Sequence, residues 1–273
     1  YMHDLSGNNL GNHYRYINTG TDPDLTPPSV THTTVDEGDS GVPTNVKLNV
    51  RFDESLNPLD TSAISLRDSF DQEVPVNVSL SRNRTFVSVV PKQLLNDFSS
   101  YQLTVDGMKD LAGNTQITSL IRNFTTGATV DMTTGSAVRW SIPNNNTQNV
   151  PLNPLLQVSF SERIDPATVD SGSFYLWDEV SGLSVPGQWQ ISADRLTLTF
   201  IPDEPLRENA RHYLYVGYSP YLTDLAANVV AFNNYRYFTT GTSEDSSAPV
   251  VSSSNFIDGN EDVPVNGRIV LTY

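Results

Sequence analysis

The chain has 273 residues with 31 acidic and 16 basic side chains, which gives a formal net charge of -15. Nucleic acid and anionic membrane surfaces would repel this charge, so neither is expected as a partner. Cysteine is absent, which excludes disulfides, thiolate nucleophiles and zinc–cysteine sites.

Hydrophobic residues make up 37% of the chain, which is enough for packed cores, and the length suits about two domains. No apolar run approaches the ~20 residues that span a bilayer, so direct membrane insertion is not expected. The first residues, YMHDLSGN, lack the charged and apolar regions of a signal peptide. We therefore expect any targeting signal to lie outside this sequence.

Two signatures repeat along the chain. One reads DLSGNNLGNHYRYINTG at 4–20, DLAGNTQITSLIRNFTTG at 110–127 and DLAANVVAFNNYRYFTTG at 224–241. The other reads VPTNVKLNVRFDESL at 42–56, VPLNPLLQVSFSERI at 150–164 and VPVNGRIVLTY at 263–273. The spacing predicts the end of one repeat at 1–21, whole repeats at 25–127 and 133–241, and the start of another repeat at 247–273.

Within the whole repeats, apolar residues alternate with polar ones at a period of two, which predicts strands with one face on a core. The alternating positions are Val46/Leu48/Val50/Phe52, Val74/Val76/Val78/Leu80, Val87/Val89, Tyr101/Leu103/Val105, Leu156/Val158/Phe160, Leu196/Leu198/Phe200 and Tyr213/Tyr215. Frequent Pro, Gly, Asn and Asp residues separate these runs. The pattern is typical of an all-β sandwich with about seven strands per repeat.

Two local features support a sandwich. Tyr101 and Tyr213 stand at the head of the penultimate strand, where a tyrosine corner would bond its hydroxyl to nearby backbone; the alternative is a pair of half-buried aromatic residues. Asp110, Gly113 and Asn114 are expected to form the last hairpin turn. In the second repeat Ala227 replaces the glycine, so Asn228 should carry more of that turn.

The motifs PPxV, VPxNxxxxVxFxE, a tyrosine-led strand, DxAGN and a terminal FTTG occur in this order. Together they resemble the bacterial Ig-like domain family of S-layer and surface proteins. The resemblance implies tandem immunoglobulin-like β-sandwich repeats at a cell surface or outside the cell. Such domains serve as stalks, spacers, adhesive modules and assembly units, so the resemblance leaves the exact role open.

Catalytic motifs are missing from the sequence. There is no HExxH, GxSxG, SxxK or glycine-rich phosphate loop, and a small sandwich offers no cleft between its carboxylate pairs. His3, His13, His32 and His212 lie apart in the sequence, and we interpret each as a surface residue. We expect no enzymatic activity and no cofactor other than calcium.

Calcium is the one metal that the sequence suggests. Carboxylates cluster where a linker would meet the ends of the sandwich loops, and Ca²⁺ takes about six to eight oxygen ligands. The alternative is that these residues are turn formers and solubilising charge. The predicted ligands are Asp22, Asp24, Asp53, Glu54 and Asp110 in the first repeat, and Asp131, Glu162, Asp165 and Asp224 in the second.

All three tryptophans, Trp140, Trp177 and Trp189, belong to the second repeat. Exposed aromatic residues there could contact a protein or stack on a sugar, and a protein contact is the preferred interpretation. The predicted contact residues are Trp177, Trp189, Tyr218 and Tyr221. The expected partners are neighbouring repeats, copies of the chain itself, a surface protein or a glycan.

The sequence therefore predicts a non-catalytic structural or adhesive stalk segment of a long extracellular bacterial surface or filament-forming protein. Short linkers at about 21–27, 128–135 and 242–249, of which the first and the last contain proline, would make it a semi-rigid rod, stiffened by any calcium bound there. Two alternatives stay open. One is a carbohydrate-binding accessory module of a secreted enzyme, and the other is a filament subunit that exchanges strands between its two incomplete ends.

Overall fold

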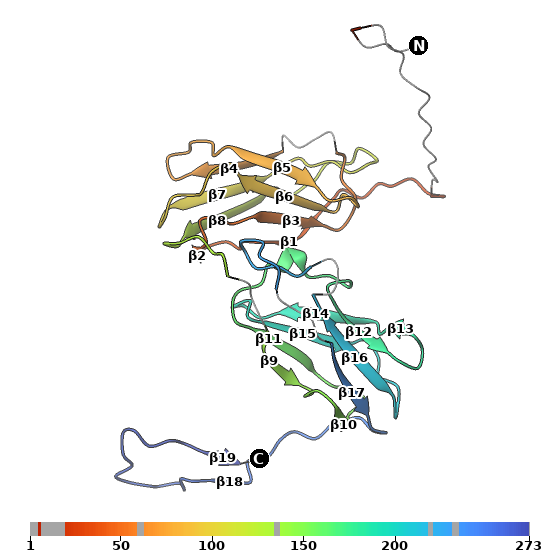
Figure 1. Ribbon diagram of the computed structural model, residues 1–273, viewed down its shortest axis with the longest axis vertical. Helices are drawn as coiled ribbons and strands as arrows, with labels where there is room; N and C mark the ends of the chain where they lie inside the picture. The colour runs from red at the N-terminus through yellow and green to blue at the C-terminus, as the bar shows by residue number, and fades with distance from the viewer. Residues whose placement is uncertain are drawn as a thin grey trace. The chain divides into compact units, whose positions relative to one another are not determined.

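The computed structural model describes residues 5–6, 20–58, 63–133, 137–217, 221–230 and 235–272, with only the backbone of 137–142. The chain divides into two compact units, Tyr1–Thr129 and Val130–Tyr273, each built around one of the whole repeats (Figure 1). Among the described residues, no helix is long and apolar enough to cross a membrane.

The first repeat folds into two four-stranded sheets (Figure 1). One sheet has the order β1 (Val30–Thr33), β3 (Leu48–Phe52), β6 (Phe86–Pro91) and β5 (Val76–Leu80). The other has the order β2 (Asp39–Val42), β8 (Leu120–Thr126), β7 (Ser100–Val105) and β4 (Ile64–Asp68). All neighbours are antiparallel except β2 and β8, which pair in parallel. The opening segment of the repeat thus splits into β1 and β2, which join opposite sheets.

The second repeat follows the same plan. One sheet has the order β14 (Gly187–Ile191), β15 (Thr197–Pro202), β11 (Leu156–Phe160) and β9 (Ala137–Ile142). The other has the order β10 (Thr147–Val150), β17 (Arg236–Thr240), β16 (Arg211–Val216), β12 (Phe174–Asp178) and β13 (Leu183–Ser184). A 3-10 turn, Pro166–Thr168, lies between β11 and β12, and β10 pairs with β17 in parallel.

The inward-facing residues of each repeat form its core. In the first repeat Leu48, Val50, Val87 and Val89 on one sheet, and Leu66 and Leu103 on the other, are fully buried. In the second repeat one cluster joins Leu156, Val158, Leu198, Phe174, Leu176, Leu214 and Phe238. Burying each such side chain contributes about 1.5–3 kcal/mol relative to exposing it, so each repeat has its own source of stability.

The last residues of the chain follow the second sandwich, to which Ser243 and Asp245 are still hydrogen-bonded through Leu152 and Asn153. They form a short antiparallel pair, β18 (Ser253–Ser254) with β19 (Leu271–Thr272). Val250, Val265 and Ile269 are among the apolar residues exposed there. The domain bounds 1–21 and 247–273 remain predictions.

The predicted all-β architecture is confirmed, with one error of phase. Tyr213 and Tyr215 were expected on the core face of their strand. In β16 the buried residues are instead His212, Leu214 and Val216, which places both tyrosines on the outer face of the sheet. About seven strands were expected, and the described part of the first repeat has eight, β1 to β8, because its opening segment is divided between β1 and β2.

Candidate functional sites

Three carboxylates meet at one end of the first sandwich. Asp24 precedes β1, Glu54 follows β3 and Asp110 follows β7, and one oxygen of each lies within 4.8 Å of the others. Asp24 is exposed, Glu54 is half-buried and Asp110 is buried. All three belong to the predicted ligand set.

The second repeat has the same arrangement. Asp131, Glu162 and Asp224 each offer an oxygen within 4.8 Å of the others. Glu162 follows β11 as Glu54 follows β3, and Asp224 opens the last turn as Asp110 does. The sequence signatures are duplicated, and two aspartates and one glutamate therefore meet at the same end of each sandwich.

The local electrostatics show that these carboxyls interact. Burial raises the pKa of Glu54, and the nearby carboxylates of Asp24, Asp110 and Asp53 raise it further. Burial also raises the pKa of Glu162 and of Asp224, and Asp131 adds to both shifts. A cation among these oxygens would offset the repulsion that raises the pKa values.

An asparagine in each repeat fixes the linker to this cluster. Asn114 donates from its amide Nδ2 to the backbone oxygens of Asp24 and Thr26, at 3.2 and 3.3 Å, and to the Asp110 carboxylate at 2.7 Å. Asn228 donates in the same way to the Asp131 backbone oxygen at 3.3 Å and to Asp224 at 2.9 Å. The last turn of each sandwich therefore holds the segment that leads into it.

The other three predicted ligands have different contacts. An Asp53 carboxylate oxygen accepts from the Ser29 backbone N–H at 2.8 Å. Asp165 is buried and caps the 3-10 turn by accepting from the Ala167 N–H at 2.9 Å. Asp22 accepts from the Thr21 hydroxyl at 3.0 Å. None of the three belongs to the two groups of mutually close carboxylates among the described residues.

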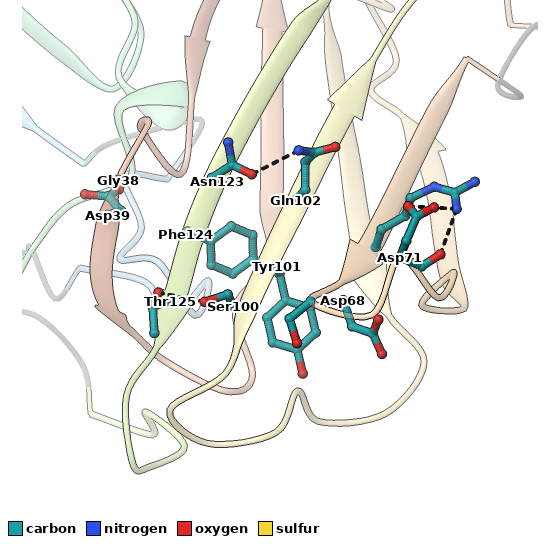
Figure 2. A pocket seen from close by; sticks show the side chains of 12 residues that line it. Gly38, Asp39, Asp68, Asp71, Ser100, Tyr101, Gln102, Asn123, Phe124 and Thr125 are labelled. Carbon is teal, nitrogen blue, oxygen red and sulfur yellow. Dashed lines mark hydrogen bonds and ion pairs between the residues drawn. The ribbon is translucent and has the colours of Figure 1, made fainter.

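Each repeat also has a pocket at the head of its penultimate strand. In the first repeat a pocket of about 340 Å³ is lined by residues that include Tyr101, Gln102, Asn123 and Asp68 (Figure 2). In the second repeat a pocket of about 530 Å³ is lined by residues that include Asp178, Arg207 and His212.

His212 was predicted to be a surface residue, and that prediction is wrong: its relative exposure is 1%. The ring lies at 5.4 Å from Phe238 in a stacked arrangement, because His212 occupies an inward position of β16. His32 is half-buried, whereas His3 and His13 lie outside the described residues.

The predicted contact residues have different environments. Trp177 lies half-buried on the outer face of β12, and Tyr221 is 62% exposed. Trp189 packs partly buried against the core of the second repeat. Tyr218 lies outside the described residues. The outer-facing Tyr213 and Tyr215 were missed as surface residues, although the buried Leu214 and Val216 between and after them carry the signal.

Comparison with known proteins agrees with this architecture. The chain belongs to the bacterial Ig-like domain family, which it matches over residues 24–126 and 132–240. The predicted family and the tandem immunoglobulin-like β-sandwich fold are thereby confirmed. No curated protein sequence matches the chain.

Solved structures show lower similarity. The N-terminal part of the bacterial S-layer protein SbsC is 15% identical with a TM-score of 0.30, over 78% of this chain and 44% of that one. SbsC domains 1–6 are 15% identical with a TM-score of 0.31, over 84% and 27%. An L,D-transpeptidase from Mycobacterium smegmatis is 17% identical with a TM-score of 0.28, over 61% and 62%. The chain spans less than half the length of these SbsC structures.

Proposed function

We propose that the chain is a non-catalytic structural segment of an extracellular bacterial surface protein, in which tandem sandwiches act as a spacer. The observation that carries this proposal is the pair of consecutive bacterial Ig-like domains at 24–126 and 132–240. Each has its own packed core. Stacked modules of this kind gain reach by repetition, without a binding cleft.

The pocket of the second repeat that His212 lines also favours a structural role. It contains an acid and a histidine, but Nδ1 of His212 lies 3.2 Å from the Ala210 backbone oxygen. The Asp178 carboxylate accepts from Arg207 at 3.1 Å and from the Val180 N–H at 2.8 Å. These contacts anchor the loops around β12 and β16, which is a structural use of both groups.

Calcium binding is the second part of the proposal. The carboxylates of Asp24, Glu54 and Asp110, and those of Asp131, Glu162 and Asp224, supply hard oxygen ligands of the kind that Ca²⁺ prefers. Backbone oxygens of the linker and water would complete the coordination. A cation at this position would tie the linker to the sandwich that follows it and restrict bending.

Two measurements test the structural role. Mild protease treatment of intact cells of the organism that encodes the chain should remove the protein, because a surface spacer is exposed outside the cell. Small-angle scattering of the chain should show an extended particle that becomes stiffer in Ca²⁺. Protection of the protein until the cells are lysed, or a compact globular scattering profile, would overturn the spacer proposal.

The finer roles of adhesion and filament assembly belong to the same proposal. Intact mass of the native protein and sedimentation of the chain distinguish a segment of a longer repeat protein from a subunit of a strand-exchanged filament. A mass well above 30.1 kDa would support a segment of a longer repeat protein. Polymers built from chains of about that mass would instead support strand exchange between subunits.

A further inference from the structure

The outer face of one sheet in the second repeat carries a cluster of tyrosines and a tryptophan. The aromatic face, as we call it, spans β12, β16, the start of β17 and the residue before it. It consists of Tyr175, Trp177, Tyr213, Tyr215, Tyr235 and Tyr237. Five of these side chains are half-buried and Tyr235 is 51% exposed, so the surface is open to solvent.

The side chains of the aromatic face contact one another across the strands. Trp177 pairs with Tyr213 in the strand register, and Tyr213 pairs with Tyr237. Tyr175 and Tyr215 stack with centroids 4.9 Å apart and an interplanar angle of 14°. Tyr235 packs against Tyr213 at 5.3 Å and against Tyr215 at 5.7 Å. The aromatic rings therefore form a continuous surface across three neighbouring strands.

The first repeat shows that the fold does not require these aromatic residues. By strand register, Ser65, Arg67, Gln102, Thr104 and Asn123 occupy the positions of Tyr175, Trp177, Tyr213, Tyr215 and Tyr237. There the Gln102 amide donates to the Asn123 side-chain oxygen at 3.0 Å, as Figure 2 shows. The same sheet position is thus polar in one repeat and aromatic in the other. The sandwich therefore forms with either set of residues at these positions.

Polar groups border the aromatic face at one end. The Tyr213 hydroxyl donates to Glu179 at 2.9 Å, and the Arg211 guanidinium lies 5.1 Å from the centroid of the Tyr237 ring. Arg211 and Glu179 are 3.9 Å apart, with side chains 47% and 49% exposed. Both therefore keep donors and acceptors directed at solvent beside the rings.

This combination matches the chemistry of a sugar. A pyranose presents C–H groups on its faces, which pack on aromatic rings, and hydroxyls around its rim, which replace water on Arg211 and Glu179. The outward positions of β12 and β16 carry Tyr175, Trp177, Arg211, Tyr213 and Tyr215 and no aliphatic side chain. An apolar protein partner would bury this charged pair. It would offer no polar groups to replace the hydrogen bonds that the pair makes to water.

Net charge distinguishes among the remaining candidate partners of the aromatic face. A second copy of the chain carries the same net charge of -15, and an acidic polysaccharide is also negative. Both are repelled at low salt, whereas a neutral polysaccharide is not. We propose that the aromatic face is a binding site for a neutral polysaccharide, which adds a glycan-binding activity to the second repeat alone.

The test uses the whole chain and four polysaccharides. Retention on insoluble cellulose and chitin is measured by pull-down, and retardation by dextran and by acidic hyaluronan is measured by affinity electrophoresis. At least one neutral polymer should bind. The triple variant Tyr213→Gln, Tyr215→Thr, Tyr237→Asn, which installs the residues of the first repeat, should reduce that binding at least tenfold. The matched variant Gln102→Ala, Asn123→Ala in the first repeat should leave binding unchanged.

Tryptophan fluorescence reports the folding of the second-repeat variants, and scanning calorimetry reports the folding of the first-repeat variant, because all tryptophans lie in the second repeat. If the triple variant is unfolded, Trp177→Arg provides the same test at a single position. Absence of binding to all three neutral polymers, binding to hyaluronan alone, or unchanged binding in the variants would overturn the proposal. A dimer in sedimentation velocity that the triple variant converts to monomer, without neutral-polymer binding, would assign the face to self-association. The spacer function is tested separately by surface exposure, so it stands or falls independently.

Discussion

Tyr101 and His212 occupy the same position in the two repeats. Each is the second residue of the penultimate strand and is paired on one side with an aspartate, Asp68 or Asp178. Each also stacks on a phenylalanine of the last strand, with ring centroids 5.8 Å apart for Tyr101 and Phe124 and 5.4 Å for His212 and Phe238. The second repeat has therefore placed a titratable imidazole where the first has a phenol.

The Tyr101 hydroxyl completes a tyrosine corner, because it accepts a hydrogen bond from the Asn96 backbone N–H at 2.9 Å. Tyr101→Phe leaves that N–H without its acceptor and should lower the free energy of unfolding of the first repeat by about 1 kcal/mol. Differential scanning calorimetry measures the change. Tyr213→Phe is the control, because its hydroxyl is on the outer face and its loss should change stability by less than about 0.5 kcal/mol. Equal effects of the two substitutions would contradict the tyrosine-corner assignment.

His212 should make the second repeat sensitive to acid. Burial lowers the pKa of His212 below its ordinary value, even though the nearby Asp178 acts in the opposite direction. The unfolded chain then binds the proton more readily, so the stability contributed by neutral His212 is present above the ordinary histidine pKa and is lost as pH falls below it. Thermal unfolding at pH 7.5 and 5.5, followed by tryptophan fluorescence, tests this.

All three tryptophans lie in the second repeat, so their fluorescence isolates its transition. His212→Tyr restores the residue of the first repeat and should reduce the loss of melting temperature at pH 5.5. The remaining acid sensitivity belongs to other groups and serves as the baseline. A pH dependence identical in His212→Tyr and in the original chain would show that His212 is not responsible.

The sequence was sufficient to predict the repeats and most central strands, because inward Val, Leu and Phe residues alternate with outward polar residues over several positions of each strand. It did not predict β4 or β12, whose inward apolar residues are only Ile64 with Leu66 and Phe174 with Leu176. Two apolar positions are too few to establish a period. The phase of β16 was misjudged because tyrosine is compatible with either face of a sheet, and packing decides between them.

The predicted carboxylates illustrate a similar limit. The positions of Asp24, Glu54 and Asp110 follow from the topology, because the linker and two loops lie at the same end of a sandwich. Asp53 and Glu54 are neighbours in the sequence, and side-chain direction alternates along an extended segment. The pattern could not decide which of the two joins the cluster, and the structure brings Glu54 together with Asp24 and Asp110.

The turn before the last strand offers a direct comparison of glycine with alanine. Gly113 has a φ of 95°, and its counterpart Ala227 has a φ of 67°. Asn228 was expected to carry more of this turn, but alanine itself adopts the left-handed conformation. Ala227→Gly should stabilise the second repeat by about 0.5–1 kcal/mol, because the relief of strain exceeds the entropy cost of glycine. Gly113→Ala should destabilise the first repeat through the backbone, since its Cβ would have no atom within 4 Å. Denaturant unfolding of both variants checks the opposite signs.

Calcium should stabilise the second repeat through Asp131, Glu162 and Asp224. Without a cation, burial and then the neighbouring carboxylates raise the pKa of Glu162. A raised folded-state pKa means that the stability of the protonated group is present at low pH and is lost as pH rises through that pKa. Ca²⁺ compensates the resulting repulsion, so its effect on the fluorescence-monitored melting temperature should grow between pH 5 and pH 7.5.

Glu162→Gln should remove most of this gain and, in EDTA at pH 7.5, should stabilise the repeat by up to about 1 kcal/mol, since solvent screens a half-buried group. The exposed Glu204 is the control, and Glu204→Gln should retain the calcium response. Identical melting in Ca²⁺ and EDTA across this pH range would show that the carboxylates are turn formers and surface charge.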